Sequence, residues 1–141
     1  MTPNILKDPQ VYISKEARTL FDSMKRMPDF QKFVNKDFFM LAMLFGYHKK
    51  RRKPLKRSER TQSGYARERY FFKEDMEFIK AAAISEENDL KVVESVPNMF
   101  SIAEEYVNGG ISFLKEFIFD NPADFVKKFA GYLKKNLTDS N

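Results

Sequence analysis

The sequence predicts a mainly α-helical protein: a compact multi-helix single domain over residues 1–141, interrupted by one long basic loop at about 48–69. Apolar residues recur at helical spacing on both sides of that loop, and typical helix-start residues precede several of the apolar runs. The chain is long enough to bury a core without disulfide bonds. Fifteen Phe and no Trp residues predict a core of phenyl rings. At most one short strand or hairpin is expected.

The first helix should follow an extended segment at residues 11–14, with Ser14 as its N-cap. Five apolar residues then recur at helical spacing and should face the core. They are Ala17, Leu20, Phe21, Met24 and Met27. Pro28 is expected to end this helix.

A second helix should start with Asn35 as its cap, and every residue from Phe38 to Phe45 is apolar. A helix without a polar face lies either at the centre of a fold or in a subunit interface, so a homodimer is an open alternative. Gly46 marks the expected end or weak point of this helix.

The segment after the basic loop is helical in pattern. The acidic residues Glu74, Asp75 and Glu77 suit the first turn of a helix, where the helix dipole favours negative charge. A short helix over residues 90–96 should follow, stopped by Pro97.

The last part of the chain predicts three further helices. Asn98 is the expected cap of the first, and Asn108-Gly109-Gly110 predicts a turn with positive φ before a new helix begins at Ile111. Asn121-Pro122 has the features of another helix start. Residues 1–10 and 137–141 are expected to be flexible.

The charge distribution is the strongest functional signal. Residues 48–69 contain ten Lys or Arg and two Asp or Glu, whereas residues 70–141 contain eight and thirteen. This middle segment therefore holds more than the whole net charge of +5. Because Pro54 and Gly64 interrupt it, we expect a partly mobile loop, with a short strand at residues 70–72.

We predict that this loop binds DNA phosphates without sequence specificity. Tyr47, Tyr65 and Tyr70 flank it and could stack on exposed bases. Three alternatives stay open: a solvated loop, a nuclear import signal, or docking on an acidic protein surface. The predicted nucleic-acid-binding residues are Lys49, Lys50, Arg51, Lys53, Arg52, Lys56, Arg57, Arg60, Arg67 and Arg69.

Several function classes lack support in the sequence. The absence of cysteine excludes disulfides, cysteine nucleophiles and cysteine-ligated zinc. The only histidine, His48, is expected to be an exposed loop residue. Glu74, Asp75 and Glu77 could hold magnesium in a nuclease, but a helix start explains them more simply. We therefore expect no enzyme activity, no metal and no cofactor.

The longest apolar run, residues 38–45, is far too short to span a bilayer, which needs roughly 20 residues. The N-terminus lacks the apolar stretch of a signal peptide. A soluble, cytoplasmic protein without membrane contact is expected.

Two stretches resemble a known family. One is residues 38–55, an apolar helix followed by Gly-Tyr, a basic run and Pro-Leu; the other is Glu104-Glu-Tyr-Val-Asn-Gly-Gly110. Together they resemble the DNA phosphorothioation (dnd) system-associated protein 4 family over roughly residues 11–119. The resemblance implies a prokaryotic accessory component of a defence system that places sulfur in the DNA backbone and restricts unmodified DNA. Larger subunits of that system would be its partners, and DNA contact is favoured over nuclear import.

Overall fold

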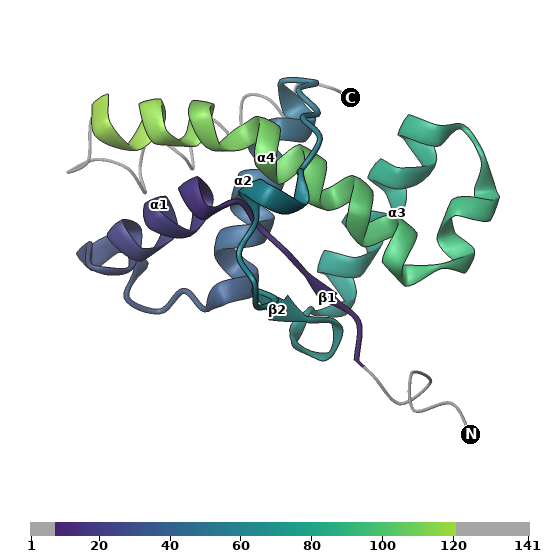
Figure 1. The fold of residues 1–141 in the computed structure, drawn as a ribbon, viewed down its shortest axis with the longest axis horizontal. Coiled ribbons are helices and arrows are strands. Elements are labelled where there is room, and N and C mark those ends of the chain that lie inside the picture. The colour runs from purple at the N-terminus through teal and green to yellow at the C-terminus, as the bar shows by residue number, and fades with distance from the viewer. Residues whose placement is uncertain (1–7, 121–141) are drawn as a thin grey trace.

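Within residues 8–120, helix α2, Asn35–His48, lies at the centre of the fold, and three other α-helices surround it (Figure 1). The computed structural model describes residues 8–120, with side chains to residue 118. This part of the chain is mainly helical, as predicted. The surrounding helices are α1 (Lys15–Lys25), α3 (Lys73–Glu87) and α4 (Val96–Asp120). The short elements are β1 (Gln10–Val11), η2 (Pro28–Phe30), η3 (Arg57–Glu59), β2 (Ala66–Arg67), η4 (Glu68–Tyr70) and η5 (Leu90–Glu94).

Helix α1 forms as its sequence predicts. Ser14 is the N-cap: its hydroxyl accepts a hydrogen bond of 3.0 Å from the Ala17 amide, which has no partner within the helix. The helix ends at Lys25, three residues before Pro28. Its buried face consists of Ala17, Leu20, Phe21 and Met24.

Helix α2 is surrounded by aromatic contacts to the other elements. Phe38 stacks on Phe21 of α1 at 5.6 Å between ring centroids, and Phe45 meets Phe117 of α4 at 5.4 Å. Most of residues 38–45 are fully buried, which confirms the prediction that this helix lacks a water-facing side. Because this face is filled within one chain, it gives no separate reason to expect a dimer.

The start of α2 differs from our prediction. Val34 is the N-cap residue, and the carboxylate of Asp37 accepts its amide hydrogen at 2.9 Å. Asn35 is the first helical residue instead; its side chain donates to the Tyr65 carbonyl at 2.9 Å. The Asn35 side chain, which the local pattern predicted to cap the helix, therefore makes a long-range hydrogen bond instead.

Helix α4 runs without a break through Asn108-Gly109-Gly110, so the predicted turn is wrong. No glycine within residues 8–120 has a positive φ. These glycines instead allow close approach. A Cβ on Gly110 would overlap the Ala42 carbonyl oxygen and lie 2.6 Å from the Gly46 nitrogen. Likewise, Gly46 does not end α2, which continues to His48. A Cβ on Gly46 would overlap the Tyr106 carbonyl, so this glycine also permits the close approach of α4.

The starts of α3 and α4 are also informative. Glu74 and Asp75 occupy the first turn of α3, as predicted. The expected short helix is the 3₁₀ helix η5. Helix α4 begins at Val96, so Pro97 lies in its first turn rather than ending a helix, a position where the missing amide costs nothing. Asn98 is not the cap; its amide donates to the Ser95 hydroxyl at 3.3 Å.

Some predictions lie outside the described residues: the helix expected from Asn121, and most of the two termini. None of the helices described between residues 8 and 120 is long and apolar enough to cross a membrane.

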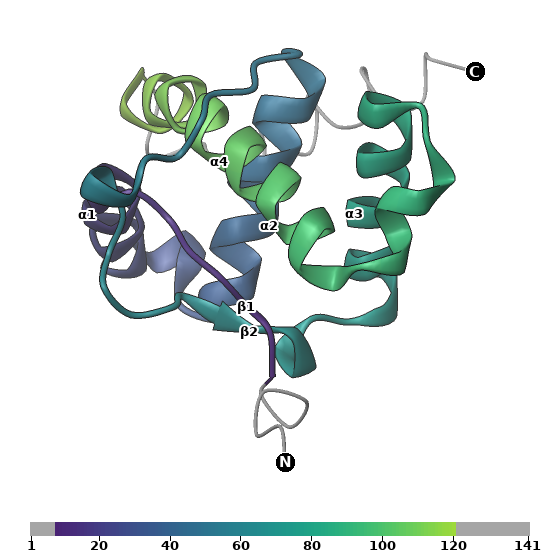
Figure 2. The ribbon, with the colours of Figure 1, turned by 45° about the vertical axis from the view of Figure 1, so that its right-hand side comes forward.

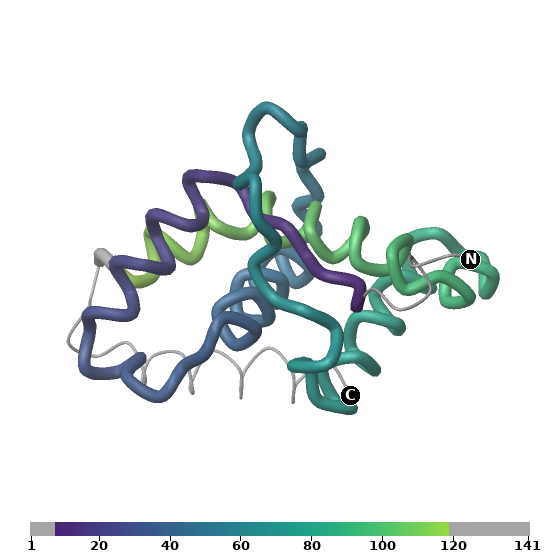
Figure 3. The backbone as a smooth tube through the Cα atoms, turned by 60° about the horizontal axis from the view of Figure 1, so that its bottom comes forward, coloured from purple at the N-terminus to yellow at the C-terminus, as the bar shows by residue number. Residues whose placement is uncertain are grey.

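The basic segment, residues 48–69, contains the short elements η3 and β2, and its strand is at residues 66–67 rather than 70–72. Strands β1 and β2 pair antiparallel, with Val11 opposite Ala66. The Tyr65 amide donates to the Val11 carbonyl at 2.7 Å, and the Thr61 amide to the Ile13 carbonyl at 3.1 Å. The segment thus runs beside the N-terminal strand over several residues (Figure 3).

The glycine contact between α2 and α4 should be essential for stability. Replacing Gly110 with Ala forces a methyl group against the backbone of α2, and we expect a loss of about 3 kcal/mol in the free energy of unfolding, measured with urea. Gly64→Ala is the matched control, because the atoms nearest its methyl belong to the flexible Gln10 side chain. Equal stability of the two variants would contradict this account.

Candidate nucleic-acid interface

The basic segment leaves α2 through a tight helix-ending turn. The Arg51 amide donates to the Gly46 carbonyl at 2.9 Å, and the Lys50 amide to the Tyr47 carbonyl at 3.1 Å. This pair of bonds is a Schellman motif, in which the residue after the C-cap takes a left-handed conformation. That residue is Lys50, with φ of 53°, where glycine is the usual choice. The turn directs the chain across α4.

The main chain then crosses α4 in close contact (Figure 2). The Lys53 amide donates to the Glu105 carbonyl at 3.0 Å. The Asn108 side chain donates to the carbonyls of Lys53 and Pro54, at 3.3 and 2.9 Å. A Cβ on Gly109 would overlap the Arg51 carbonyl, so this crossing needs a glycine on the α4 side. The backbone of residues 51–54 is therefore fixed.

Arg52 points toward the domain and not away from it. Its guanidinium lies 2.6 Å from a carboxylate oxygen of Glu105, 3.0 Å from Glu86 and 3.3 Å from Glu87. The side chain is 27% exposed. Three carboxylates from α3 and α4 thus offset its charge, and Arg52 holds the segment in place.

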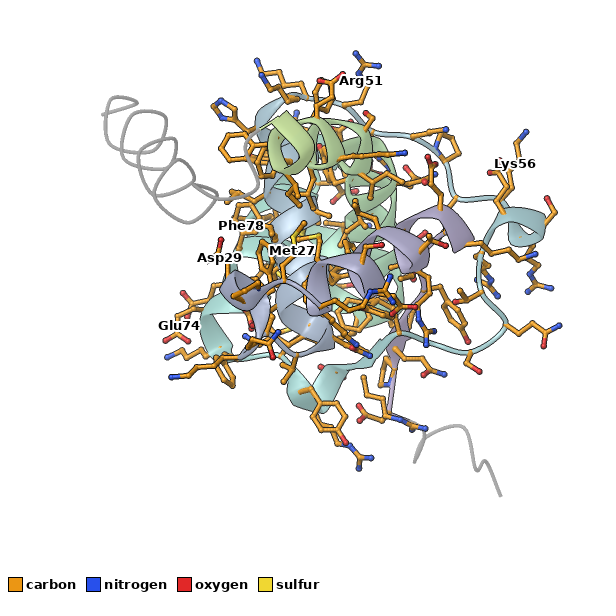
Figure 4. The ribbon with its side chains drawn as sticks, turned by 90° about the vertical axis from the view of Figure 1, so that its left-hand side faces the viewer. Met27, Asp29, Arg51, Lys56, Glu74 and Phe78 are labelled. Carbon is orange, nitrogen blue, oxygen red and sulfur yellow. The ribbon has the colours of Figure 1, made fainter. Side chains whose placement is uncertain are left out.

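The neighbouring cations are exposed. Within residues 8–120, none of the six side chains that we term the basic strip forms an ion pair. Lys49 and Arg51 both lie near the Phe113 ring of α4, at 5.6 and 5.3 Å from its centroid. Figure 4 shows Arg51 and Lys56 reaching outward from the ribbon. The basic strip consists of Lys49, Lys50, Arg51, Lys53, Lys56 and Arg57.

The remaining predicted cations lie apart from the strip. Arg60 is half-buried, with its guanidinium 4.0 Å from the centroid of the Tyr12 ring. Arg67 and Arg69 are exposed near β2, and Arg69 lies 3.2 Å from a carboxylate oxygen of Asp8. Because Tyr65, next to β2, contacts the first residue of α2, this pair and the strip lie at opposite ends of that helix. Eight of the ten predicted residues therefore form two exposed groups, and Arg52 and Arg60 belong to neither.

The flanking tyrosines differ in exposure. Tyr47 is half-buried against Tyr106 and Phe78, and Tyr65 is buried. Tyr70 is 57% exposed, so it alone of the three offers a ring to a ligand. His48 lies half-buried in the last turn of α2, which corrects the prediction of an exposed loop residue.

Of the three acidic residues that we considered for magnesium, Asp75 has structural contacts. One oxygen of Asp75 accepts hydrogen bonds from the Lys36 ammonium at 2.6 Å and from the Phe72 amide at 2.8 Å. Among residues 8–120, no group of three or more Asp, Glu or His side chains is placed to hold a metal ion.

Glu104 of α4 is a titratable group with a shifted pKa, and it lies near Tyr12 and Arg60. The Tyr12 amide donates to its carboxylate at 2.8 Å. Burial raises the pKa of Glu104 to about 7, although this hydrogen bond and the charge of Arg60 act in the opposite direction. The connection between β1 and α4 is therefore sensitive to pH near neutrality.

The two stretches that carried the family resemblance meet in space, at the crossing of α2, α4 and the basic segment. A model of the DNA sulphur modification system-associated protein 4 family matches residues 10–140. The chain belongs to this family. No curated protein and no solved structure matched it. The description of this family associates its members with a DNA sulphur modification system.

The sequence did not predict the residues that hold the basic strip in place. Glu105, Asn108 and Gly109 each contact the segment directly. The sequence pattern placed Glu105 on a helix without a binding role and assigned Asn108 and Gly109 to a turn. One signal could have indicated these residues: a carboxylate, an amide and a glycine follow one another closely at Glu105, Asn108 and Gly109.

The two adjacent arginines of the segment should respond differently to substitution. Arg52→Gln leaves three carboxylates without their cation, and we expect about 2 kcal/mol lower unfolding free energy. Arg51→Gln removes the same charge from an exposed position and should change stability by less than about 0.5 kcal/mol. Urea unfolding of both variants is the measurement, and the reverse order would refute the assignment of Arg52.

Glu104 should make stability depend on pH. The folded chain holds its proton up to about pH 7, against an ordinary pKa of 4.5, so ionisation costs stability as pH rises between those values. Glu104→Gln keeps an acceptor for the Tyr12 amide but removes the titration. Its stability relative to the native chain should be greater at about pH 8 than at about pH 5. A difference that is constant with pH would contradict the raised pKa.

Proposed function

We propose that this protein is a non-enzymatic, cytoplasmic DNA-binding accessory protein of a phosphorothioation modification and restriction system, in which the basic strip contacts backbone phosphates. The observation that carries the proposal is the strip itself: six exposed cations, without ion pairs inside residues 8–120, on a main chain fixed to α4. Phosphates attract such side chains whatever the base sequence.

The fixed backbone supports binding rather than simple solvation. A solvated loop needs no hydrogen bonds to the domain, whereas residues 51–54 are bonded to α4 on both their amide and carbonyl groups. Ordering the segment in advance lowers the entropy lost on binding. Only the ends of the long side chains would still have to be immobilised.

Lys50 gives a second, local argument. A left-handed conformation costs a non-glycine residue about 1 kcal/mol or more, and the helix-ending turn would accept glycine readily. A lysine at this strained position adds a positive charge to the strip at the expense of stability. That combination is expected where charge serves binding.

The strip offers phosphate contacts but no means of reading bases. Specific readout needs side chains placed against base edges in a groove, commonly from a helix. Here the cations follow an irregular extended segment. We therefore propose largely sequence-independent binding, with larger subunits of the system as further partners.

The main alternative is that the strip docks on an acidic surface of a larger restriction or modification subunit. The same exposed cations would serve that contact. The two functions differ in their ligand, so nuclease treatment distinguishes them: a complex with the subunit would survive it, whereas one bridged by DNA would not.

A salt titration of duplex DNA binding tests the proposal. We compare the native chain with a variant in which Lys49, Arg51, Lys53 and Lys56 are all Gln. If each contacts a phosphate, the slope of log affinity against log salt should fall in magnitude by about 3 to 4, with large loss of affinity at low salt. Arg52 is left intact so that the domain keeps its ion pairs.

The matched control removes the same charge elsewhere. Arg26, Lys32, Lys80 and Lys91 are exposed and lie outside the strip, so changing all four to Gln gives equal net charge. This control should keep most of the affinity and slope. Equal losses in both variants would mean that only net charge matters, and no binding by the native chain would rule out the DNA proposal.

A further inference from the structure

A second surface, at the opposite end of α2 from the basic strip, combines a groove with exposed aromatic rings. The groove has a volume of about 950 Å³, within the range of small-molecule sites. It lies between the start of α2, the segment 62–67 and residues 70–72. We refer to it as the β2 groove.

The β2 groove gathers the exposed apolar side chains of the domain. Four large apolar residues within 8–120 are strongly exposed, and three of them line this groove: Val34 at 57%, Tyr70 at 57% and Phe72 at 64%. The fourth, Leu90, lies elsewhere. Such concentration on one concave surface indicates a binding site.

Phe72 is difficult to explain by folding alone. It is the N-cap residue of α3, a position that favours Ser, Thr, Asp or Asn, and its side chain makes no capping bond. The ring is nevertheless held in place, because the Lys36 ammonium lies 3.7 Å from its centroid. Lys36 is fixed in turn by Asp75 at 2.6 Å and Asp37 at 3.2 Å.

Tyr70 has a similar arrangement. The Arg69 guanidinium lies 5.4 Å from the centroid of its ring, and Asp8 pairs with that guanidinium. Both exposed rings of the groove therefore have a cation near them while most of the side chain stays open to solvent. Cation–π contacts of this kind position a ring without burying it.

The charge of the lining favours an anionic ligand. The lining includes three cations, Lys25, Lys36 and Arg67, and no Asp or Glu. Asp37 and Asp75 offset the charge of Lys36, so Lys25 and Arg67 are the cations available to an anion. Gln62 and Ser63 add an amide and a hydroxyl that could meet the polar edge of a base. Aromatic faces beside cations suit single-stranded nucleic acid, in which bases stack and phosphates pair.

A peptide ligand fits less well. Extended peptides commonly add a strand to an exposed sheet edge and gain affinity from a row of backbone hydrogen bonds. Strand β2 spans only residues 66–67, which leaves a very short edge. The rings and cations, in contrast, need no edge.

We propose that the β2 groove binds single-stranded DNA, with unpaired bases stacked on Tyr70 and Phe72 and phosphates beside Lys25 and Arg67. This site goes beyond the duplex contacts of the basic strip and does not depend on them. It gives the protein a surface that distinguishes unpaired from paired DNA, since duplex bases are already stacked on one another.

The chain contains no Trp, so a Phe72→Trp variant carries a single indole reporter inside the groove. Titration of the full-length variant with a short thymidine oligonucleotide should quench the indole emission in a saturable way, and a duplex of equal length should compete poorly. Absence of quenching by the single strand would overturn the proposal and leave the groove to a protein ligand.

A second pair of variants measures affinity without the reporter. Replacing Tyr70 and Phe72 together by Leu should weaken single-strand binding by about tenfold or more and leave duplex binding unchanged. Leu90→Ala, which alters an exposed apolar residue outside the groove, should change neither. Combined with Phe72→Trp, the four-Gln variant of the strip should lose duplex binding but keep the indole quenching, so failure of one site is distinguishable from failure of the other. Unchanged single-strand affinity in the Leu variant would also overturn the proposal.

Discussion

The close crossing of α2 and α4 is the contact on which the rest of this structure depends. Gly46 and Gly110 remove the two side chains that would separate the helix backbones, and Gly109 removes the next one, so that the basic segment can cross α4. Three backbones are thereby layered with almost no side chains between them. Each glycine costs about 1 kcal/mol of helix propensity, which the packing must exceed. A larger residue at any of the three positions would displace a layer.

This layering determines which charges are available. As the segment crosses α4, its main chain is bonded to Glu105 and Asn108, and Arg52 is drawn to three carboxylates of α3 and α4. The cations on either side of Arg52 have no such partners within the described chain and remain in solvent. The acidic excess of the C-terminal half therefore does not neutralise the basic segment as a whole. It fixes one arginine and leaves the others exposed.

Local patterns predicted the elements that depend on local interactions. Ser14 caps α1, and the apolar run from Phe38 to Phe45 forms the central helix. Local patterns failed where contacts between residues distant in the sequence determine the structure. The missing Cβ of glycine permits a turn and also permits a close helix crossing, so the sequence at Gly109-Gly110 cannot distinguish these two structures. Similarly, Arg51 and Arg52 are chemically alike neighbours, and only the tertiary contacts pair Arg52 with three carboxylates and leave Arg51 exposed near Phe113.

The two proposed DNA contacts impose a geometric condition on any single ligand that uses both. The basic strip begins at the C-terminal end of α2, and the β2 groove lies at its N-terminal end. Fourteen residues of helix separate these ends by about 20 Å, which corresponds to roughly six nucleotides along a duplex strand. A uniform duplex would satisfy the strip but present no unpaired base to Phe72, and a uniform single strand would lack the regular phosphate spacing of a duplex. A junction between paired and unpaired DNA supplies both, so the arrangement favours DNA that is locally opened over either form alone.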